Sequence, residues 1–235
     1  MEQNKRQVLG ILGGLGPAAS CYLYQMLIDH TPARKDQDHI DLVLSSRAST
    51  PDRTAFITGQ SDEDPFDIME QDGRSLVRYG ATVLAIPCNT AHYFYDRLVP
   101  SLQIPFLHMI RETAEQARAL GIRRAGLLST DGTRRSGLYD RFFREADIEL
   151  LTLEPADQAV VTSVIYDQVK AGRMDFDIEP LQQVVDGLAG RGAEAVILGC
   201  TELPVVFPRI CFSAHVLDPT EILARAALRF AGALS

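Results

Sequence analysis

The chain has 235 residues and a formal net charge of −8, with 46% hydrophobic residues and four cysteines. This length suits one large domain or two small ones, and the acidic balance argues against a nucleic-acid surface while still allowing a small anionic substrate held by a few cations. Because the sequence shows no apolar run of about eighteen residues and no signal-peptide pattern, we expect no membrane segment and a cytoplasmic protein.

The first predicted element is a buried strand at residues 8–12, followed by GGLGP at residues 13–17 and a helix reaching residue 29. Residues 14–19 match the dinucleotide pattern G-x-G-x-x-A, but the next strand, at residues 40–45, leads into serine where an acidic residue would hold a ribose. We therefore expect Gly14 either to let the backbone approach a small ligand or to form a tight turn.

A polar segment follows at residues 46–64, and we expect it to be an ordered loop over the same edge of the sheet. Within this loop Arg53 either clamps a carboxylate through two hydrogen bonds or faces solvent. Helical periodicity at residues 65–79 then ends at Gly80, a residue type that commonly follows the end of a helix.

Two similar stretches organise the rest of the chain, GATVLAIPCNTAH at residues 80–92 and GAEAVILGCTEL at residues 192–203. In each stretch Gly-Ala precedes a short apolar run, and a cysteine, Cys88 or Cys200, stands eight residues after the glycine. The apolar runs are typical of strands buried in a parallel sheet. The repeat therefore predicts two halves of similar fold, with the two thiols in equivalent places.

Small polar residues that suit helix caps follow each thiol, Asn89 and Thr90 in one copy and Thr201 and Glu202 in the other. Each cysteine is thus expected where a strand ends and a helix begins, the edge at which open α/β sheets bind ligands. Backbone amides and the helix dipole there would favour the thiolate and lower the cysteine pKa. One such cysteine alone could equally be a small buried hydrophobe, but the duplication favours a function.

After the first cysteine we expect a helix as far as residue 98, ended by Pro100, in which His92 either tunes the thiol or packs within the helix. The sequence STDGT at residues 129–133 takes the place that residues 13–17 hold in the first half. The other expected elements are strands at residues 104–107, 125–128, 149–153 and 215–217, and helices at residues 109–120, 137–146, 157–171, 178–190 and 219–234.

This order of elements predicts an α/β fold of two pseudo-symmetric subdomains, each a mostly parallel sheet flanked by helices, with the active site in the cleft between them. We assign residues 1–106 and 214–235 to the N-terminal subdomain, because the last helix is expected to pack back on the first half, and residues 107–213 to the C-terminal subdomain. The chain has no Cys-x-x-Cys pair and its histidines are dispersed, so we expect no metal site.

Two thiols that face each other across a cleft suit the transfer of a proton at a carbon acid. One thiolate would remove the α-proton and the opposite thiol would return a proton to the other face, which inverts the configuration. The carbanion must be stabilised by donors aimed at the substrate carboxylate, and the thiols would titrate as a coupled pair. Suitable donors at the strand ends are Asn89, Thr90, Thr130 and Thr201.

The motifs also identify a family resemblance that runs over nearly the whole chain. They are GGLGP at residues 13–17, TPARKDQDHI at 31–40, PDRT at 51–54, PCNTAHYFYD at 87–96, LHMIRET at 107–113, STDGT at 129–133 and GCTEL at 199–203. With these motifs the chain resembles the PLP-independent aspartate/glutamate racemase superfamily, particularly its aspartate racemase branch.

The resemblance implies two α/β subdomains around a central cleft, commonly as a homodimer, with no cofactor and with Cys88 and Cys200 as the acid/base pair. It implies an acidic amino-acid substrate whose distal carboxylate binds Arg53 and Lys170. Taken alone, Lys170 would be only a cation favoured near a helix C-terminus. The substrate-binding residues expected in this way are Gly14, Arg53, Asn89, Thr90, Thr130, Lys170, Thr201 and Glu202.

Some positions depart from the family pattern. Aspartate racemases often carry an asparagine-rich stretch before PDRT, whereas this chain has SSRAST at residues 45–50, in which Arg47 either holds a second acidic group or faces solvent. Glu202 separates the chain from glutamate racemases, which usually place histidine there. The roles of Cys21 and Cys211 stay open.

The leading hypothesis is therefore a cofactor-independent racemase of aspartate, with glutamate as the second substrate. A maleate isomerase of the same superfamily also uses two cysteines, so the thiols do not separate these enzymes. From a different class, a non-catalytic sensor of acidic amino acids could have kept the same cleft. An NAD-dependent dehydrogenase is disfavoured because the acidic residue for the ribose is missing.

Overall fold

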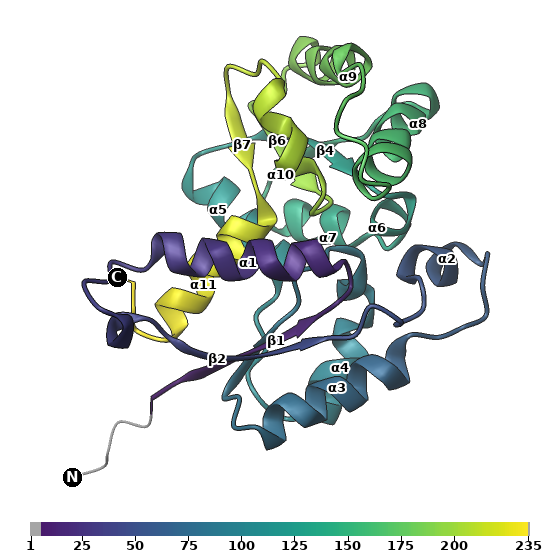
Figure 1. Ribbon diagram of the computed structural model, residues 1–235. Coiled ribbons are helices and arrows are strands. Elements are labelled where there is room, and N and C mark those ends of the chain that lie inside the picture. The colour runs from purple at the N-terminus through teal and green to yellow at the C-terminus, as the bar shows by residue number, and fades with distance from the viewer. Residues whose placement is uncertain (1–5, 235) are drawn as a thin grey trace.

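The computed structural model of the chain describes residues 6–234 and shows two α/β halves, one above the other in Figure 1. The first half holds a three-stranded sheet in the order β2-β1-β3, and the second a four-stranded sheet in the order β5-β4-β6-β7. Every pairing is parallel. The expected fold class is confirmed. The strands are β1 (Val8–Gly13), β2 (Asp41–Ser46), β3 (Val83–Ala85), β4 (Arg124–Ser129), β5 (Glu149–Leu151), β6 (Ala195–Gly199) and β7 (His215–Leu217).

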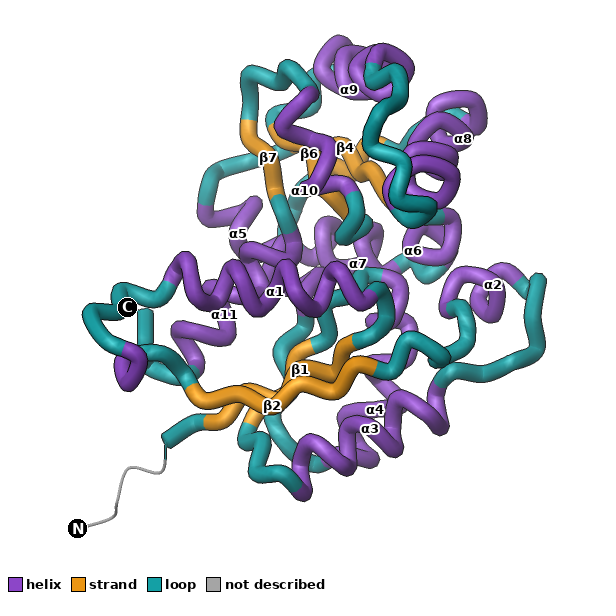
Figure 2. Tube along the Cα trace, in the orientation of Figure 1, coloured by secondary structure: helices purple, strands orange, loops and turns teal. Residues whose placement is uncertain are grey.

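Helices cover both faces of the first sheet, which explains why its central strand β1 is buried along almost its whole length. Strand β1 contributes to two cores, because Leu9 and Ile11 pack on one face of the sheet and Leu12 on the other. Figure 2 shows the same arrangement, with strands inside and helices outside. On the first face lie α1 (Pro17–His30) and α11 (Pro219–Phe230), and on the second α3 (Phe66–Arg78) and α4 (Tyr95–Leu102).

The second sheet is covered in the same way. Its two cores share β4 and β6, whose residues are all buried except the first of β4. One face carries α5 (Met109–Ala119) and α7 (Leu138–Glu145), and the other carries α8 (Pro155–Ser163), α9 (Glu179–Gly190) and α10 (Leu203–Val206).

The last helix of each half packs on the sheet of the other half. Helix α5 follows the end of the first sheet, yet its Ile110 and Ala114 lie in the core over β4 and β6. Helix α11 follows β7 of the second sheet, yet its Leu223 and Leu228 lie in the core over β1 and β3. These two exchanged helices also contact each other. The expected packing of the last helix on the first half is confirmed.

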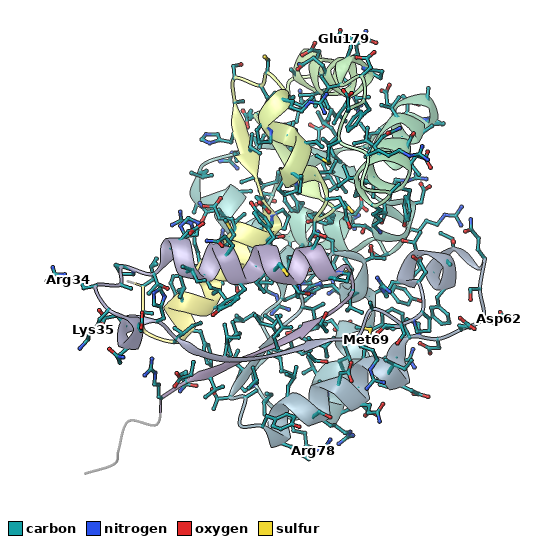
Figure 3. All side chains as sticks on the ribbon, in the orientation of Figure 1. Arg34, Lys35, Asp62, Met69, Arg78 and Glu179 are labelled. Atoms are coloured by element: carbon teal, nitrogen blue, oxygen red, sulfur yellow. The ribbon has the colours of Figure 1, made fainter. Side chains whose placement is uncertain are left out.

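Charged side chains such as Arg34, Arg78 and Glu179 lie on the outside of the molecule, as Figure 3 shows. Met69 lies instead between α3 and the first sheet, where it is 1% exposed. Among residues 6–234, no helix is long and apolar enough to cross a membrane.

The polar segment at residues 46–64 is not wholly a loop, because it contains α2 (Arg53–Thr58). The Asp52 carboxylate accepts the backbone N–H of Ala55 at 2.8 Å and caps this helix, and Gly59 ends it with a positive φ of 75°. The sequence STDGT likewise leads into α6 (Asp131–Arg135), which is capped by Thr130. Both segments are thus positioned by helix caps.

Pro100 does not end the helix that follows Cys88, contrary to the prediction. A 3₁₀ segment, η2 (Thr90–Phe94), leads into α4, which continues past Pro100 to Leu102 and is followed by Gln103 with a φ of 55°. Buried Leu98 and Leu102 hold the last turn against the first sheet. The strand expected at residues 104–107 is reduced to one bridge between Leu84 and Phe106.

Two further elements differ from the prediction. The helix expected at residues 157–171 divides into α8 and a π-helical segment, η3 (Val164–Val169), in which the Lys170 N–H donates to the Ile165 carbonyl five residues back. Strand β7 pairs with β6, so residues 215–217 belong to the second sheet and not to the first half, where the sequence analysis placed them. A strand this short carries too little pattern to specify its neighbour.

We expect Leu223→Ala to lower the free energy of unfolding by about 2–5 kcal/mol, because it opens a cavity in the core that α11 forms with the first sheet. Leu120→Ala, at a position 43% exposed, is the matched control and should change stability by about 0.5 kcal/mol or less. Urea unfolding followed by circular dichroism measures both. Equal costs for the two variants would show that α11 does not stabilise the first half.

Candidate active site

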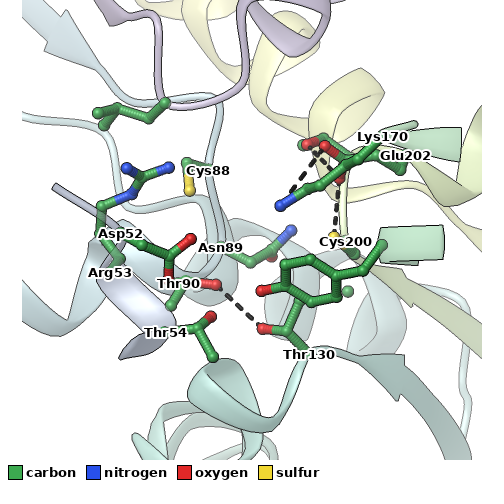
Figure 4. A pocket seen from close by; sticks show the side chains of 14 residues that line it. Asp52, Arg53, Thr54, Cys88, Asn89, Thr90, Thr130, Lys170, Cys200 and Glu202 are labelled. Atoms are coloured by element: carbon green, nitrogen blue, oxygen red, sulfur yellow. Dashed lines mark hydrogen bonds and ion pairs between the residues drawn. The ribbon is translucent and has the colours of Figure 1, made fainter. Parts of the chain in front are cut away.

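The two cysteines lie beyond the carboxyl ends of corresponding strands in the two sheets. Cys88 follows β3 three residues after Ala85, and Cys200 directly follows β6. Each cysteine is 8% exposed, and all four cysteines of the chain are free thiols. Cys88 and Cys200 line one cleft from opposite walls, as Figure 4 shows. The structure thus brings together two thiols that lie far apart in the sequence.

The cleft gathers every expected site residue except Gly14. Its side chains leave about 20 Å³ of free space, room for about one water molecule. The residues that line it are Leu15, Asp52, Arg53, Thr54, Cys88, Asn89, Thr90, Thr130, Tyr166, Lys170, Gly199, Cys200, Thr201 and Glu202.

Gly14 lies next to the cleft, in the turn between β1 and α1. Its φ of +80° favours glycine, and a Cβ atom there would clash with the backbone of Arg47 at the end of β2. The tight turn therefore explains why position 14 is a glycine. The Arg47 side chain does not reach the cleft either, since its Nη2 lies 2.6 Å from the Asp72 carboxylate, which is buried on α3.

Three buried hydroxyls connect the two halves beside the cleft. Thr90 Oγ1 in the first half lies 3.2 Å from Thr130 Oγ1 and 2.9 Å from Thr133 Oγ1 in the second, and Thr130 donates to Thr133 at 3.1 Å. Because buried hydroxyls need partners, this threonine cluster fixes the spacing of the halves at the cleft. Gly132 permits the close approach, since a Cβ there would lie 2.7 Å from Thr54 Oγ1.

Asn89 is oriented by a buried tyrosine. The Tyr139 hydroxyl donates to Asn89 Oδ1 at 2.7 Å, and both side chains are buried. The Asn89 Nδ2 atom is left buried without a hydrogen-bond partner among the described residues, and it points into the cleft in Figure 4. An unpaired buried donor is costly, so this amide is suited to receive an oxygen of a ligand.

Arg53 provides a second donor on the wall that carries Cys88. Its Nη1 donates to the carbonyls of Thr50 at 3.1 Å and Pro51 at 2.8 Å, which holds the guanidinium in place. Its Nε is buried and has no partner within residues 6–234. Figure 4 shows the guanidinium beside the Cys88 sulfur.

Lys170 provides a cation near the opposite thiol. Its Nζ lies 4.4 Å from the ring centre of Tyr166 and 4.0 Å from Oε1 of Glu202. Burial lowers the pKa of Lys170, but the negative charges of Glu202 and Cys200 raise it more, so the net pKa is above its usual value. The amine is therefore charged at neutral pH, and both expected carboxylate-binding cations face the cleft.

The Cys200 thiol has a carboxylate as its direct partner. Cys200 Sγ donates to Glu202 Oε2 at 2.8 Å, and Thr201 Oγ1 donates to the same oxygen at 3.3 Å. Burial raises the pKa of Cys200 well above its usual range, and Glu202 raises it further, whereas Lys170 opposes them. The expectation that the strand end lowers this pKa is wrong, because the four-residue α10 is too short to outweigh burial and an adjacent carboxylate.

His92 supports the backbone of Cys88 and does not contact its sulfur. Its Nδ1 donates to the Cys88 carbonyl at 2.8 Å, and its Nε2 accepts the N–H of Met109 at 3.1 Å. The ring is 1% exposed, and burial lowers the pKa of His92 to about 4. A neutral imidazole therefore ties the cysteine segment to the start of α5.

Sequence reasoning missed several residues that shape the site. Thr54 and Thr133 end the motifs PDRT and STDGT, so those motifs were the available signal. Tyr139 and Tyr166 lie on helices with no motif around them, and only their packing reveals their role. Among the described residues, no three His, Cys, Asp or Glu side chains gather so that they could hold a metal ion.

A wider hollow adjoins the cleft between α1 and α10. This outer groove has a volume of about 480 Å³ and shares five residues with the cleft. Its other walls are largely apolar, so it joins charged side chains at one end to an apolar channel. The shared residues are Asp52, Arg53, Lys170, Thr201 and Glu202, and the apolar wall includes Pro17, Ala18, Val169 and Val205.

Known proteins share both this fold and this sequence pattern. Residues 12–227 match the model of the Asp/Glu/Hydantoin racemase family. The chain therefore belongs to the Asp/Glu/Hydantoin racemase family, which confirms the resemblance found in its motifs.

Individual relatives cover nearly the whole chain. The broad specificity amino-acid racemase RacX of Bacillus subtilis is 26% identical over 93% of this chain and 95% of its own. The solved aspartate racemase of Picrophilus torridus has a TM-score of 0.84 and 31% identity, covering 96% of this chain and 94% of that one. A glutamate racemase of Francisella tularensis in complex with D-glutamate, at a TM-score of 0.68 and 17% identity, shares the fold over 98% of this chain and 83% of its own.

We expect His92 to stay neutral in the folded protein until the pH falls to about 4, whereas in the unfolded chain it protonates near about 6.5. The stability from the neutral ring is then complete above about pH 6.5 and is lost as the pH falls toward 4. Two-dimensional NMR of the imidazole nitrogens, with urea-unfolded protein as reference, measures this pKa. A folded-state midpoint near the unfolded value would contradict the structural role of His92.

Proposed function

We propose that this protein is a cofactor-independent amino-acid racemase that interconverts L- and D-aspartate by a two-cysteine proton transfer. The observation that carries the proposal is the pair of thiols on opposite walls of one cleft, with two cations suited to carboxylates beside them. Family membership and the likeness to an aspartate racemase of Picrophilus torridus support it.

The chemistry is a proton transfer between the two faces of the α-carbon. One cysteine, as thiolate, takes the α-proton, and the other, as thiol, gives its proton to the opposite face of the resulting carbanion. Because the thiols come from different halves of the protein, a bound α-carbon has one sulfur on each side. Inversion then requires no rotation of the substrate.

The carbanion is the costly intermediate, and its charge spreads onto the α-carboxylate. The unpaired Asn89 Nδ2 is a preorganised donor for that charge, because Tyr139 already holds the amide in position. The threonine cluster offers further hydroxyls at the same end of the cleft. We assign these groups to the α-carboxylate.

Arg53 and Lys170 are the groups suited to the side-chain carboxylate. Arg53 keeps a buried Nε without a partner among the described residues, and Lys170 is a cation that lines the same cleft. A dicarboxylic substrate would satisfy both, and a bidentate contact to the guanidinium would fix its orientation. Aspartate is the substrate we favour, with glutamate second.

A racemase of broader specificity is the second candidate, because the outer groove opens beside Arg53 and Lys170. A longer or apolar side chain could extend into this groove, and the likeness to RacX of Bacillus subtilis agrees with such a range. Assays over acidic, polar and apolar amino acids decide between the two. Loss of maleate absorbance would point instead to a maleate isomerase, and ligand-induced thermal stabilisation without α-proton exchange to a sensor.

We expect Cys88→Ser and Cys200→Ser each to lower racemisation of aspartate by about 10²- to 10⁴-fold or more, because serine supplies no ready anion at neutral pH. Cys21→Ser and Cys211→Ser, at exposed positions, are the controls and should keep wild-type rates. Proton NMR of α-proton exchange in D₂O, together with optical rotation, measures the reaction. A wild-type rate in either single cleft variant would overturn the two-base mechanism.

We expect Lys170→Met to lower kcat/KM for aspartate by about 10- to 100-fold and that for alanine much less, because a hydrogen bond to a charged partner is worth about 1.5–3 kcal/mol. Arg173→Met removes the same charge three residues later at an exposed position and serves as the control. Steady-state assays with both amino acids give the comparison. Equal losses for aspartate and alanine would remove Lys170 from side-chain recognition.

A further inference from the structure

The two walls of the cleft differ in charge at the second residue after each cysteine. Cys88 is followed two residues later by Thr90, and Cys200 is followed two residues later by Glu202. Thr90 is used in the threonine cluster between the halves, whereas Glu202 turns its carboxylate to the cysteine of its own motif. Only one wall therefore places a carboxylate at this position.

The contacts of Glu202 are those of a side chain held against a thiol. Its Oε2 accepts from Cys200 Sγ at 2.8 Å and from Thr201 Oγ1 at 3.3 Å, and its Oε1 lies 4.0 Å from Lys170 Nζ. The Glu202 side chain is 13% exposed.

Glu202 also lies where the buried thiol meets the open groove. It lines the closed cleft together with Cys200, and it lines the outer groove between α1 and α10. A proton on its carboxylate is thus within reach of the Cys200 sulfur on one side and of groove water on the other. The other titratable groups that face Cys200 or the cleft are Asp52, Arg53, Cys88, Tyr139, Tyr166 and Lys170.

We propose that Glu202 is the proton partner of Cys200: its carboxylate holds the Cys200 thiol in the resting enzyme and carries a proton from the outer groove to that sulfur after turnover. The first part stands on the Cys200–Glu202 contact alone, and the second rests on the proposed racemase function. The sequence analysis expected Glu202 to bind the substrate. In this proposal Glu202 instead positions a proton.

With this role for Glu202, every proton lost or gained in one catalytic cycle is accounted for. Cys88 thiolate takes the α-proton, so a C–H bond breaks and an S–H bond forms, while the Cys200 S–H bond breaks as its proton goes to the opposite face of the carbon. Cys88 is then a thiol and Cys200 a thiolate. The resting state returns when Cys88 releases its proton to solvent and Glu202 passes a proton taken from solvent to Cys200.

The test is the pH dependence with which iodoacetamide alkylates each cysteine, followed by mass spectrometry of the two peptides. In Glu202→Gln the alkylation midpoint of Cys200 should fall by about one pH unit or more, because a negative charge beside the thiol is removed. Glu202→Asp draws the carboxylate back by one methylene and should give an intermediate midpoint. Glu179→Gln, on the far surface in Figure 3, removes the same charge and should leave both profiles unchanged.

Steady-state kinetics separates proton transfer from substrate binding. We expect Glu202→Gln to lower kcat in both directions while KM for aspartate stays within about twofold. An unchanged Cys200 profile, in protein whose thermal unfolding shows it to be folded, would overturn the proposal, and so would a changed KM with an unchanged kcat. Alkylation needs no turnover, so a shifted profile in protein that racemises nothing would uphold the contact and reject the racemase function.

Discussion

The geometry of the cleft depends on the exchange of α5 and α11 between the two halves. Each helix leaves the sheet it follows and buries its apolar face on the other sheet, so neither half completes its core alone. This constraint holds the carboxyl ends of β3 and β6 toward each other. The threonine cluster then fixes the distance between the two halves more precisely than apolar packing can, because hydrogen bonds require narrow ranges of distance and angle.

The scaffold is nearly symmetric, but the chemistry on its two walls is not. Cys88 lies beside Arg53 and has its backbone carbonyl held by His92, whereas Cys200 donates to Glu202, whose carboxylate also faces Lys170. For a racemase this asymmetry has a strict limit, since two enantiomers have equal free energy and no arrangement of walls can favour one at equilibrium. The walls can determine which of the two cysteines is protonated in the substrate-free enzyme. That protonation state decides which enantiomer the enzyme accepts first.

Duplication in the sequence was sufficient to predict much of this structure. The two Gly-Ala-apolar-Cys stretches indicated the parallel strands, the equivalence of Cys88 and Cys200, and the polar residues beside them. Short elements escaped prediction for physical reasons: β7 is too short to specify its neighbour, and α2 and α6 depend on caps more than on apolar periodicity. The direction of the Cys200 pKa also could not be predicted, because it results from burial and from a carboxylate that only the folded chain brings within 2.8 Å.

The winding of the π-helical segment η3 sets the direction of Lys170. The Lys170 N–H reaches back five residues, so this turn holds one residue more than an α-helical turn would. If the same residues were wound as a regular α-helix, Lys170 would lie about 100° further around the helix axis and would point away from its present position in the cleft. The position of the cation near Cys200 is thus encoded in the winding of the backbone as much as in the residue type.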